Sequence, residues 1–270
     1  MATRHPHTGA PSRLHSLVEW RALAEIALLP VAWPLLSSTP QGDGHPVLLL
    51  PGFLADEASL VGLKTFLAGR GYAVQTWGLG RNLGFQPRHA QALEQKVRDL
   101  HASTGRKVSL VGWSLGGVFG LYGALQASDC VRQLITLGSP VNIDAAGSQA
   151  PAIVRALYRL VAHPLGAQAH ALQPRAKAMR LHQLPPLPMS CLYSLSDGVV
   201  PPQEATVAGD PALCENIRVS GSHTGLGFNA MVLAIIADRL AQPEGAWKPF
   251  KPAGVPGAVY QLLTHRAVPI

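Results

Sequence analysis

The sequence predicts an α/β fold in which a mostly parallel β-sheet is covered by helices on both faces. Short, continuous apolar runs, such as 46–53 and 131–137, are typical of parallel strands that are buried on both faces. Longer segments with helical spacing, such as 87–104, lie between these runs. A regular alternation of strand and helix favours a parallel sheet.

The expected elements follow one another along the chain after a turn-rich break at 39–44. Strands are expected at 46–53, 72–77, 108–111, 131–137, 189–194 and 216–219. Helices are expected at 59–70, 87–104, 118–122, 152–161 and 229–240. Within 87–104, Leu93, Val97 and Leu100 recur at helical spacing. Between 141 and 187 the alternation breaks down, which indicates an insertion into the domain.

The composition indicates a globular protein with a large core. The chain has 270 residues, of which 47% are hydrophobic and 14% charged, so it suits one large domain or one domain with an insertion. Its net charge of +7 raises the question of nucleic-acid binding. However, the basic residues are scattered, and aromatic residues do not alternate with them as a stacking surface requires. We therefore expect no nucleic-acid partner.

The cysteines and histidines indicate neither a disulfide framework nor a metal site. Cys130, Cys191 and Cys214 are odd in number and widely spaced, which favours buried free thiols in a reducing compartment. The sequence has no metal-binding cluster, no phosphate-binding glycine loop and no redox motif. We expect no metal and no cofactor.

The first forty residues, 1–40, form a leader with a helix expected near 14–29. The N-terminus does not resemble a signal peptide, and the apolar stretch 26–36 is too short and too interrupted by proline to span a bilayer. These features favour a cytoplasmic location. An amphipathic helix that packs on the domain is one interpretation, and peripheral contact with a membrane or a partner is the other.

The sequence GWSLG at 112–116 predicts a nucleophile elbow. It follows the apolar run 108–111 directly and precedes an apolar helix, which is the strand–turn–helix context that such an elbow needs. A sharp turn lifts the hydroxyl of Ser114 off the sheet to where a histidine can take its proton. The alternative is a plain turn in which the serine only caps the following helix.

A serine nucleophile of this kind needs a base and a carboxylate, each placed where a later strand ends. Asp197 lies in a turn after the strand at 189–194, and His223 lies in a Gly/Ser-rich loop after the strand at 216–219. Asp210 is a rival acid, but it lies next to Pro211 with no strand before it. The rival histidines are His45, His163, His170 and His182. We predict the triad Ser114, Asp197 and His223.

Two backbone N–H groups are expected to form an oxyanion hole, those of Leu115 and Phe53. Leu115 follows the serine, and Phe53 lies just after the first strong strand. The rings of Phe53 and Trp113 are expected to line an apolar acyl site, although Phe53 also fits an ordinary core position. Arg81 and Asn82 either organise the oxyanion loop by hydrogen bonds or cap a turn, and the sequence favours neither.

These motifs together resemble the α/β-hydrolase superfamily, in its bacterial esterase and triacylglycerol-lipase-like branch. The matching segments are LPGF at 50–53, GWSLGG at 112–117, SDGVVP at 196–201 and GSH at 221–223, with further likeness at 77–84 and 135–140. The resemblance implies an eight-stranded, mostly parallel sheet with an inserted cap. It divides the chain into a leader at 1–40, a core at 41–140 and 188–243, a helical cap or lid at 141–187 and a Pro/Gly-rich tail at 244–270.

The resemblance and the residues together imply a serine carboxylic-ester hydrolase that acts on small-molecule or lipid esters with a hydrophobic acyl group. Many lipases of the family have His-Gly where this chain has Pro51-Gly52. An acyltransferase with the same triad is the first alternative. A non-catalytic partner-binding protein of the same fold is the second. The oligomeric state is left open.

Overall fold

The computed structural model describes residues 19–142, 149–162, 183–252, 260, 261 and 264. Its centre is a six-stranded sheet in the order β2-β1-β3-β4-β5-β6, and every pairing in it is parallel. The strands are β1 (Pro46–Leu50), β2 (Ala73–Thr76), β3 (Val108–Trp113), β4 (Val131–Leu137), β5 (Met189–Ser194) and β6 (Cys214–Val219). The α/β fold with a parallel sheet is confirmed.

The expected count of eight strands is wrong for the part of the chain that the structure describes. All six strands that the sequence indicated directly are present, and the two additional ones came from the family resemblance. Ahead of β1, the described chain is helical over 19–36 and then irregular up to β1. Ala22–Leu36 is rich in alanine and leucine, which favour helix.

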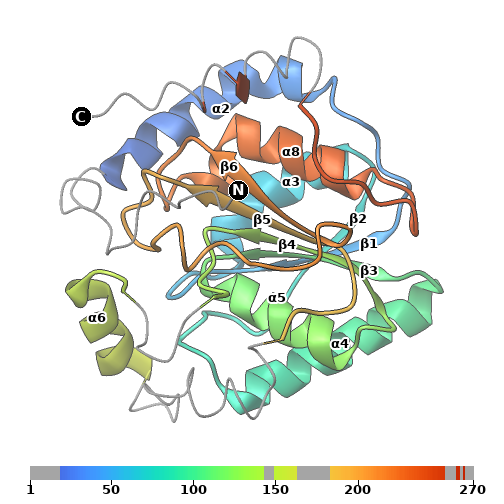
Figure 1. Ribbon diagram of the computed structural model, residues 1–270, viewed down its shortest axis with the longest axis horizontal. Coiled ribbons are helices and arrows are strands. Elements are labelled where there is room, and N and C mark those ends of the chain that lie inside the picture. Colours follow the sequence, from blue (N-terminus) through green and yellow to red (C-terminus); the bar gives the residue numbers. More distant parts are fainter. Residues whose placement is uncertain (1–18, 143–148, 163–182, 253–259, 262–263, 265–270) are drawn as a thin grey trace.

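Helices cover both faces of the sheet, with an apolar core on each (Figure 1). On one face lie α4 (Pro87–Thr104) and α5 (Leu115–Gln126); on the other lie α3 (Val61–Gly69) and α8 (Ala230–Leu240). Short 3-10 helices occur at η1 (Glu19–Arg21), η2 (Glu57–Leu60) and η4 (Leu226–Phe228). Every residue of β1, β3 and β4 is buried, which explains their continuous apolar sequences.

Helix α2 (Ala22–Leu36) lies outside the α3 and α8 layer and contacts α8 and η4 (Figure 1). It begins and ends later than the leader helix expected at 14–29, of which residues 14–18 lie outside the described part. Its inward stripe includes Ala22, Leu29 and Leu36, and the ring of Trp33 meets that of Phe66 edge-on at 6.2 Å. None of the described helices is both long and apolar enough to cross a membrane.

The predicted cap at 141–187 is described in part. Its helix α6 (Ala152–Ala162) lies to one side of the sheet, apart from α4 and α5 (Figure 1). Residues 143–148 and 163–182, with the rival histidines His163, His170 and His182, lie outside the described residues. The role of this segment as a cap or lid therefore stays a prediction.

The described residues of the predicted tail at 244–270 pack against β6 and α8. The N–H of Phe250 donates to Glu215 in β6, and the Tyr260 hydroxyl donates to the carbonyl of Arg218, also in β6. The Arg239 guanidinium of α8 lies over the Phe250 ring, 5.3 Å from its centre. The cysteines are free as expected; Cys130 and Cys191 are buried and Cys214 is half-buried.

Candidate active site

The turn between β3 and α5 holds Ser114 in a strained backbone conformation, with φ 53° and ψ −125°. Glycine is required on both sides of it. A Cβ on Gly112 would lie 2.5 Å from Gly117 Cα, and one on Gly116 would lie 2.2 Å from the carbonyl oxygen of Leu50. The serine is half-buried, and its N–H donates to the Leu137 carbonyl of β4. This is the elbow geometry that the GWSLG sequence predicted.

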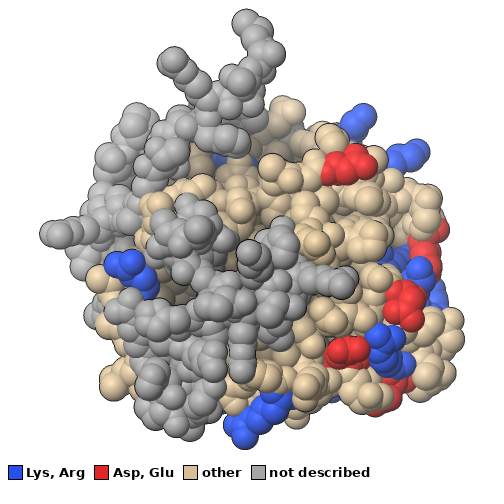
Figure 2. Space-filling model, turned by 60° about the horizontal axis from the view of Figure 1, so that its bottom comes forward, with Lys and Arg blue, Asp and Glu red and all other residues tan. Residues whose placement is uncertain are grey.

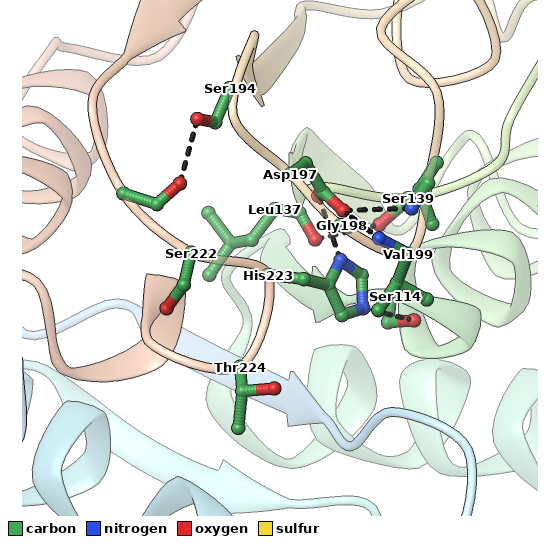
Figure 3. Close-up of polar contacts among 12 residues, drawn as sticks. Ser114, Leu137, Ser139, Ser194, Asp197, Gly198, Val199, Ser222, His223 and Thr224 are labelled. Atoms are coloured by element: carbon green, nitrogen blue, oxygen red, sulfur yellow. Dashed lines mark hydrogen bonds and ion pairs between the residues drawn. The ribbon is translucent and has the colours of Figure 1, made fainter. Parts of the chain in front are cut away.

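Ser114, His223 and Asp197 lie together where β3, β6 and β5 end at their carboxyl termini (Figure 3). His223 Nε2 is 3.0 Å from Ser114 Oγ, and its Nδ1 is 2.8 Å from Asp197 Oδ2. The histidine thus lies between a hydroxyl and a carboxylate, one on each ring nitrogen. The carboxyl ends of parallel strands meet at one edge of a sheet, which is why three distant sequence positions converge here.

The Asp197 carboxylate is fixed by its own loop. It is 2% exposed, and its Oδ1 accepts the N–H groups of Val199 and Val200 at 2.8 and 2.7 Å (Figure 3). Gly138 makes room for the pair, because a Cβ there would lie 2.8 Å from Asp197 Oδ2 and 3.2 Å from His223 Nδ1. Oδ2 therefore points to the imidazole while Oδ1 is held by the backbone.

The surroundings of His223 raise its pKa. Burial alone lowers the pKa, but the negative charge of Asp197 and its hydrogen bond outweigh burial, and the charge of Glu19 adds to them. A base with a raised pKa accepts a proton from a hydroxyl more readily, provided that it is neutral at the working pH. The negative charge of Asp197 and its hydrogen bond thus stabilise the protonated form of His223.

The loop after β1 runs directly beside the serine. A Cβ on Gly52 would lie 3.2 Å from Ser114 Cβ and 3.9 Å from its Oγ. Buried Asn82 holds this loop through two hydrogen bonds. Its side-chain Nδ2 donates to the Pro51 carbonyl at 2.9 Å, and its backbone carbonyl accepts the Leu54 N–H at 2.7 Å. Its Oδ1 also accepts the Gly84 N–H at 3.2 Å, so Asn82 both holds the loop by hydrogen bonds and caps a turn, as the two interpretations expected.

Arg81, the other residue considered for this role, is exposed and lies 3.5 Å from the Asp56 carboxylate. Phe53 is half-buried and packs against the core on the α4 and α5 side. Leu115 begins α5, in the first turn, where backbone N–H groups lack acceptors within the helix. Both N–H groups belong to segments that flank Ser114, which is compatible with their predicted oxyanion role.

Trp113 lies behind the histidine loop. Its side chain is 8% exposed, and its indole N–H donates to the His223 carbonyl at 3.1 Å. The two rings are 6.4 Å apart. Trp113 therefore supports the loop that carries the histidine, while its predicted contact with substrate stays a prediction.

Sequence reasoning missed three side chains that reach this site from the N-terminal helices. Glu19, Arg21 and Glu25 form hydrogen bonds to the loops that carry Asp197 and His223. Two acidic residues within an apolar leader were a visible signal, because an apolar helix keeps a charge where it has partners. Their sequence distance from the loops concealed those partners.

A second Ser–His–Asp arrangement lies at the opposite end of β3. His45 Nε2 is 2.7 Å from Ser109 Oγ, and His45 Nδ1 is 2.5 Å from Asp43 Oδ1. Ser109 and His45 are both fully buried. Asp43 also receives Arg106 and Arg132 at 2.7 and 2.9 Å. The rival histidine His45 is thus a buried member of a polar cluster whose Asp43 and Arg106 side chains reach the surface.

Asp210, the rival acid, makes none of the contacts that join Ser114, His223 and Asp197. Asp210 caps its own turn, accepting the Ala212 N–H at 2.9 Å. Among the described residues, no group of three or more His, Cys, Asp or Glu side chains is arranged to hold a metal ion. On the described part of the face in Figure 2, basic and acidic side chains lie interspersed.

No protein-family model matches the chain. A stretch of 58 residues is 41% identical to the pimeloyl-[acyl-carrier protein] methyl ester esterase of Vibrio atlanticus (strain LGP32). That stretch covers 22% of this chain and 22% of the relative, so the match spans about a fifth of either protein.

Several solved structures are similar to this chain in fold, although their sequence identity to it is low. The mature lipase BlEst2 of Bacillus licheniformis is 15% identical with a TM-score of 0.57, covering 76% of this chain and 95% of that one. Lipase B of Aspergillus fumigatus is 16% identical with a TM-score of 0.56, covering 86% and 59%. A soluble variant of the Saccharomyces cerevisiae monoglyceride lipase is 15% identical with a TM-score of 0.54, covering 77% and 90%.

Proposed function

Because the chain has the α/β-hydrolase fold, we propose that it is a serine carboxylic-ester hydrolase with Ser114 as nucleophile, His223 as base and Asp197 as the orienting acid. The observation that carries the proposal is the placement of His223 between Ser114 Oγ and Asp197 Oδ2, at 3.0 and 2.8 Å. The strained backbone of Ser114 supports it, because strain of this kind is kept where function needs it.

The reaction follows from these contacts in two halves. Ser114 Oγ attacks the ester carbonyl carbon as its proton passes to His223 Nε2. The tetrahedral intermediate then expels the alcohol, which takes that proton, and an acyl-serine ester remains. Water loses a proton to His223 Nε2, attacks the acyl carbon, and the collapse returns the proton to Ser114 and releases the carboxylic acid.

The charge on the tetrahedral oxygen needs preorganised donors. The N–H groups of Leu115 and Phe53 are proposed for this role, since the loop after β1 passes so close to the serine that a Cβ on Gly52 would lie 3.2 Å from Ser114 Cβ. Asn82 keeps that loop in place through its bond to the Pro51 carbonyl. Loss of one such donor typically lowers kcat by about 10²–10³-fold.

The proposed substrates are esters with an apolar acyl group. The proposed reaction needs no cofactor. Half-buried Phe53, beside the serine loop, is proposed to line the acyl site. The names of the relatives are compatible with this class, since they include a methyl ester esterase and lipases that differ in substrate.

The test is hydrolysis of p-nitrophenyl esters from acetate to palmitate by the wild type and Ser114→Ala, with labelling of both proteins by a fluorophosphonate. We expect activity with a maximum at one chain length and labelling of the wild type alone. Ser109→Ala is the matched control, because Ser109 also hydrogen-bonds a histidine but is fully buried. Equal activity in wild type and Ser114→Ala would overturn the proposal.

Two other functions would use the same fold. An acyltransferase would pass the acyl group to an alcohol, so added alcohols would yield new esters in place of free acid. A partner-binding protein without activity would not react with the fluorophosphonate. The strained backbone of Ser114 and its contact with His223 argue against this non-catalytic function.

We also propose that α2 makes peripheral contact with a lipid surface. Its outward side exposes six large apolar side chains: Trp20 of η1, then Leu23, Ile26, Leu28, Val31 and Leu35. We call this set the outer face of α2. The single charged residue within α2, Glu25, is directed to the histidine loop. The sequence ahead of the helix, 1–18, has two arginines and no acidic residue, which complements anionic lipid.

Sedimentation with vesicles tests this contact. We expect binding to phosphatidylcholine vesicles that contain phosphatidylglycerol, and weaker binding after the combined change Leu23→Gln, Leu28→Gln and Val31→Gln. Leu160→Gln removes an exposed apolar side chain elsewhere and is the control. Absence of binding would overturn the proposal, and a dimer lost in the triple variant would identify a second copy as the occupant instead.

A further inference from the structure

Three side chains from 19–25 hold both loops of the candidate active site. Glu19 Oε1 accepts the N–H of Gly198 at 2.8 Å and that of His223 at 3.0 Å, and its Oε2 accepts the Thr224 N–H at 3.0 Å. One carboxylate thus joins the residue after the acid to the histidine itself. Arg21 donates to the Ser196 carbonyl at 2.9 Å.

Glu25 holds the histidine loop from its other end. Its Oε1 accepts the N–H and hydroxyl of Ser222 at 2.7 and 2.8 Å, and its Oε2 accepts from Asn229 at 3.0 Å. Asn229 is the residue that caps α8. Together Glu19 and Glu25 accept hydrogen bonds from five donor groups in the run 222–229.

The glycines of the histidine loop are fitted to this contact. A Cβ on Gly225 would lie 2.4 Å from the Glu25 carboxyl carbon, and one on Gly221 would lie 3.0 Å from Glu25 Oε2. A contact closer than 3.0 Å requires the neighbour to move, and here the neighbour is a hydrogen-bonded carboxylate. The loop sequence therefore accommodates a side chain about two hundred positions away.

We propose that Glu19 and Glu25 are positioning residues for the reaction, with Glu19 fixing the distance between the acid and histidine loops and Glu25 fixing the histidine loop against α8. The inference rests on the proposed function, since it assigns these residues a role through His223. Neither carboxylate is placed against the reacting atoms. We call the pair the carboxylate brace.

The two members of the brace differ in their electrostatic effect. The charged groups that face His223 are Asp197 in the acid loop and Glu19 from η1. Arg21 is directed to the Ser196 carbonyl and Glu25 to Ser222. Loss of the Glu19 charge therefore lowers the pKa of His223, whereas loss of the Glu25 charge leaves that pKa in place.

The experiment compares Glu19→Gln and Glu25→Gln with the wild type, using p-nitrophenyl acetate and the pH dependence of fluorophosphonate labelling. We expect kcat to fall in both, by up to about 100-fold, with little change in KM, because a small displacement of a catalytic group has that effect. We expect the acidic limb of the labelling profile to move to lower pH in Glu19→Gln alone. Glu94→Gln removes the same charge on α4, where Glu94 pairs with Arg98, and is the control.

The outcomes separate this inference from the proposed function. A wild type that neither hydrolyses esters nor reacts with the fluorophosphonate would overturn both. If the wild type reacts and Glu19→Gln has the same kcat and the same acidic limb, the carboxylate brace is overturned and the proposed function stands. If Glu19→Gln shows no cooperative thermal unfolding transition, Glu19→Asp replaces it. Aspartate keeps the charge, so the acidic limb of the labelling profile is expected to stay in place. We expect kcat to fall, because the shorter side chain cannot reach both loops.

Discussion

Strand β3 has a serine paired with a histidine at each end, and in each pair the histidine also contacts an aspartate. The two ends differ in the backbone conformation and the burial of the serine. At the carboxyl end, Ser114 is half-buried in a strained turn with φ 53°. At the amino end, Ser109 lies within β3, beside a register shift in its pairing with β4, and is fully buried. Both histidines contact a carboxylate through Nδ1 and a serine through Nε2.

The difference shows that Ser–His–Asp geometry alone does not make an active site. Ser114 has the glycine-rich elbow and the loop at Gly52 beside it, where donors to a developing oxyanion can lie. Ser109 instead receives the Gln133 amide at 3.5 Å and faces the protein interior. The same three groups stabilise a fold at one end and, as proposed, cleave an ester at the other.

Removal of each serine is expected to give the largest contrast. Ser114→Ala loses the nucleophile, so kcat/KM should fall by about 10⁴–10⁶-fold. Ser109→Ala should keep wild-type kcat/KM, since no substrate reaches a fully buried hydroxyl. Steady-state hydrolysis of p-nitrophenyl esters measures both, and a matching loss in the two variants would remove the distinction between the ends.

Exchange of the two carboxylates for amides is the next largest effect. Asp197→Asn keeps the shape but no longer fixes the imidazole in its productive tautomer, and kcat should fall by about 10⁴-fold. Asp43→Asn should leave kcat unchanged. The same ester assay checks the pair, and a fully active Asp197→Asn protein would show that another group orients His223.

Stability should respond at the amino end. Ser109→Ala leaves the buried Nε2 of His45 without its hydroxyl, so the free energy of unfolding should fall by about 1–3 kcal/mol. Urea denaturation followed by circular dichroism measures this change. An unchanged midpoint would mean that the histidine has an alternative partner in the variant.

The two histidines should give small pH effects of opposite sign. Burial lowers the pKa of His45, so its contribution to stability is present above the unfolded pKa of about 6.5 and is lost as pH falls below it. The pKa of His223 is raised, so its contribution is present below about 6.5 and is lost as pH rises through the folded pKa.

Denaturation curves between pH 5 and 8 on His45→Gln and His223→Gln measure these contributions separately. Relative to wild type, His45→Gln should lose less stability on acidification, and His223→Gln should lose less as pH rises above about 6.5. Each effect is at most about 1.4 kcal/mol per pH unit. Parallel curves for the two variants would contradict the assigned environments.

The parts of the site that lie within a few residues of a strand end could be predicted from sequence. The elbow at 112–116 continues from β3, and Asp197 and His223 follow the ends of β5 and β6 within a few residues. Parallel strands bring these carboxyl ends together. The central strands β1, β3 and β4 could be predicted because burial on both faces leaves an uninterrupted apolar sequence. The edge strands β2 and β6 are partly exposed and contain polar residues.

The parts that depend on distant contacts could not be predicted. Glu19 and Glu25 have no local pattern that relates them to the histidine loop, and the bond from His223 to Glu19 spans 204 positions. The polar cluster at His45 left no pattern either, since its partners come from 43, 109, 106 and 132. The end of α2 was predicted too early, because contacts with α8 support a helix that continues through Pro30 and Pro34.

The bond between Glu19 and His223 also has a consequence for the nascent chain. A ribosome delivers Glu19 early and His223 late, so the carboxylate remains solvated while β1 to β5 are synthesised and pairs only after β6 has emerged. Contacts between such distant positions form after the intervening chain is ordered. Of the described strands, the last to be translated therefore completes the candidate site, and the proposed activity is expected only once that strand has paired.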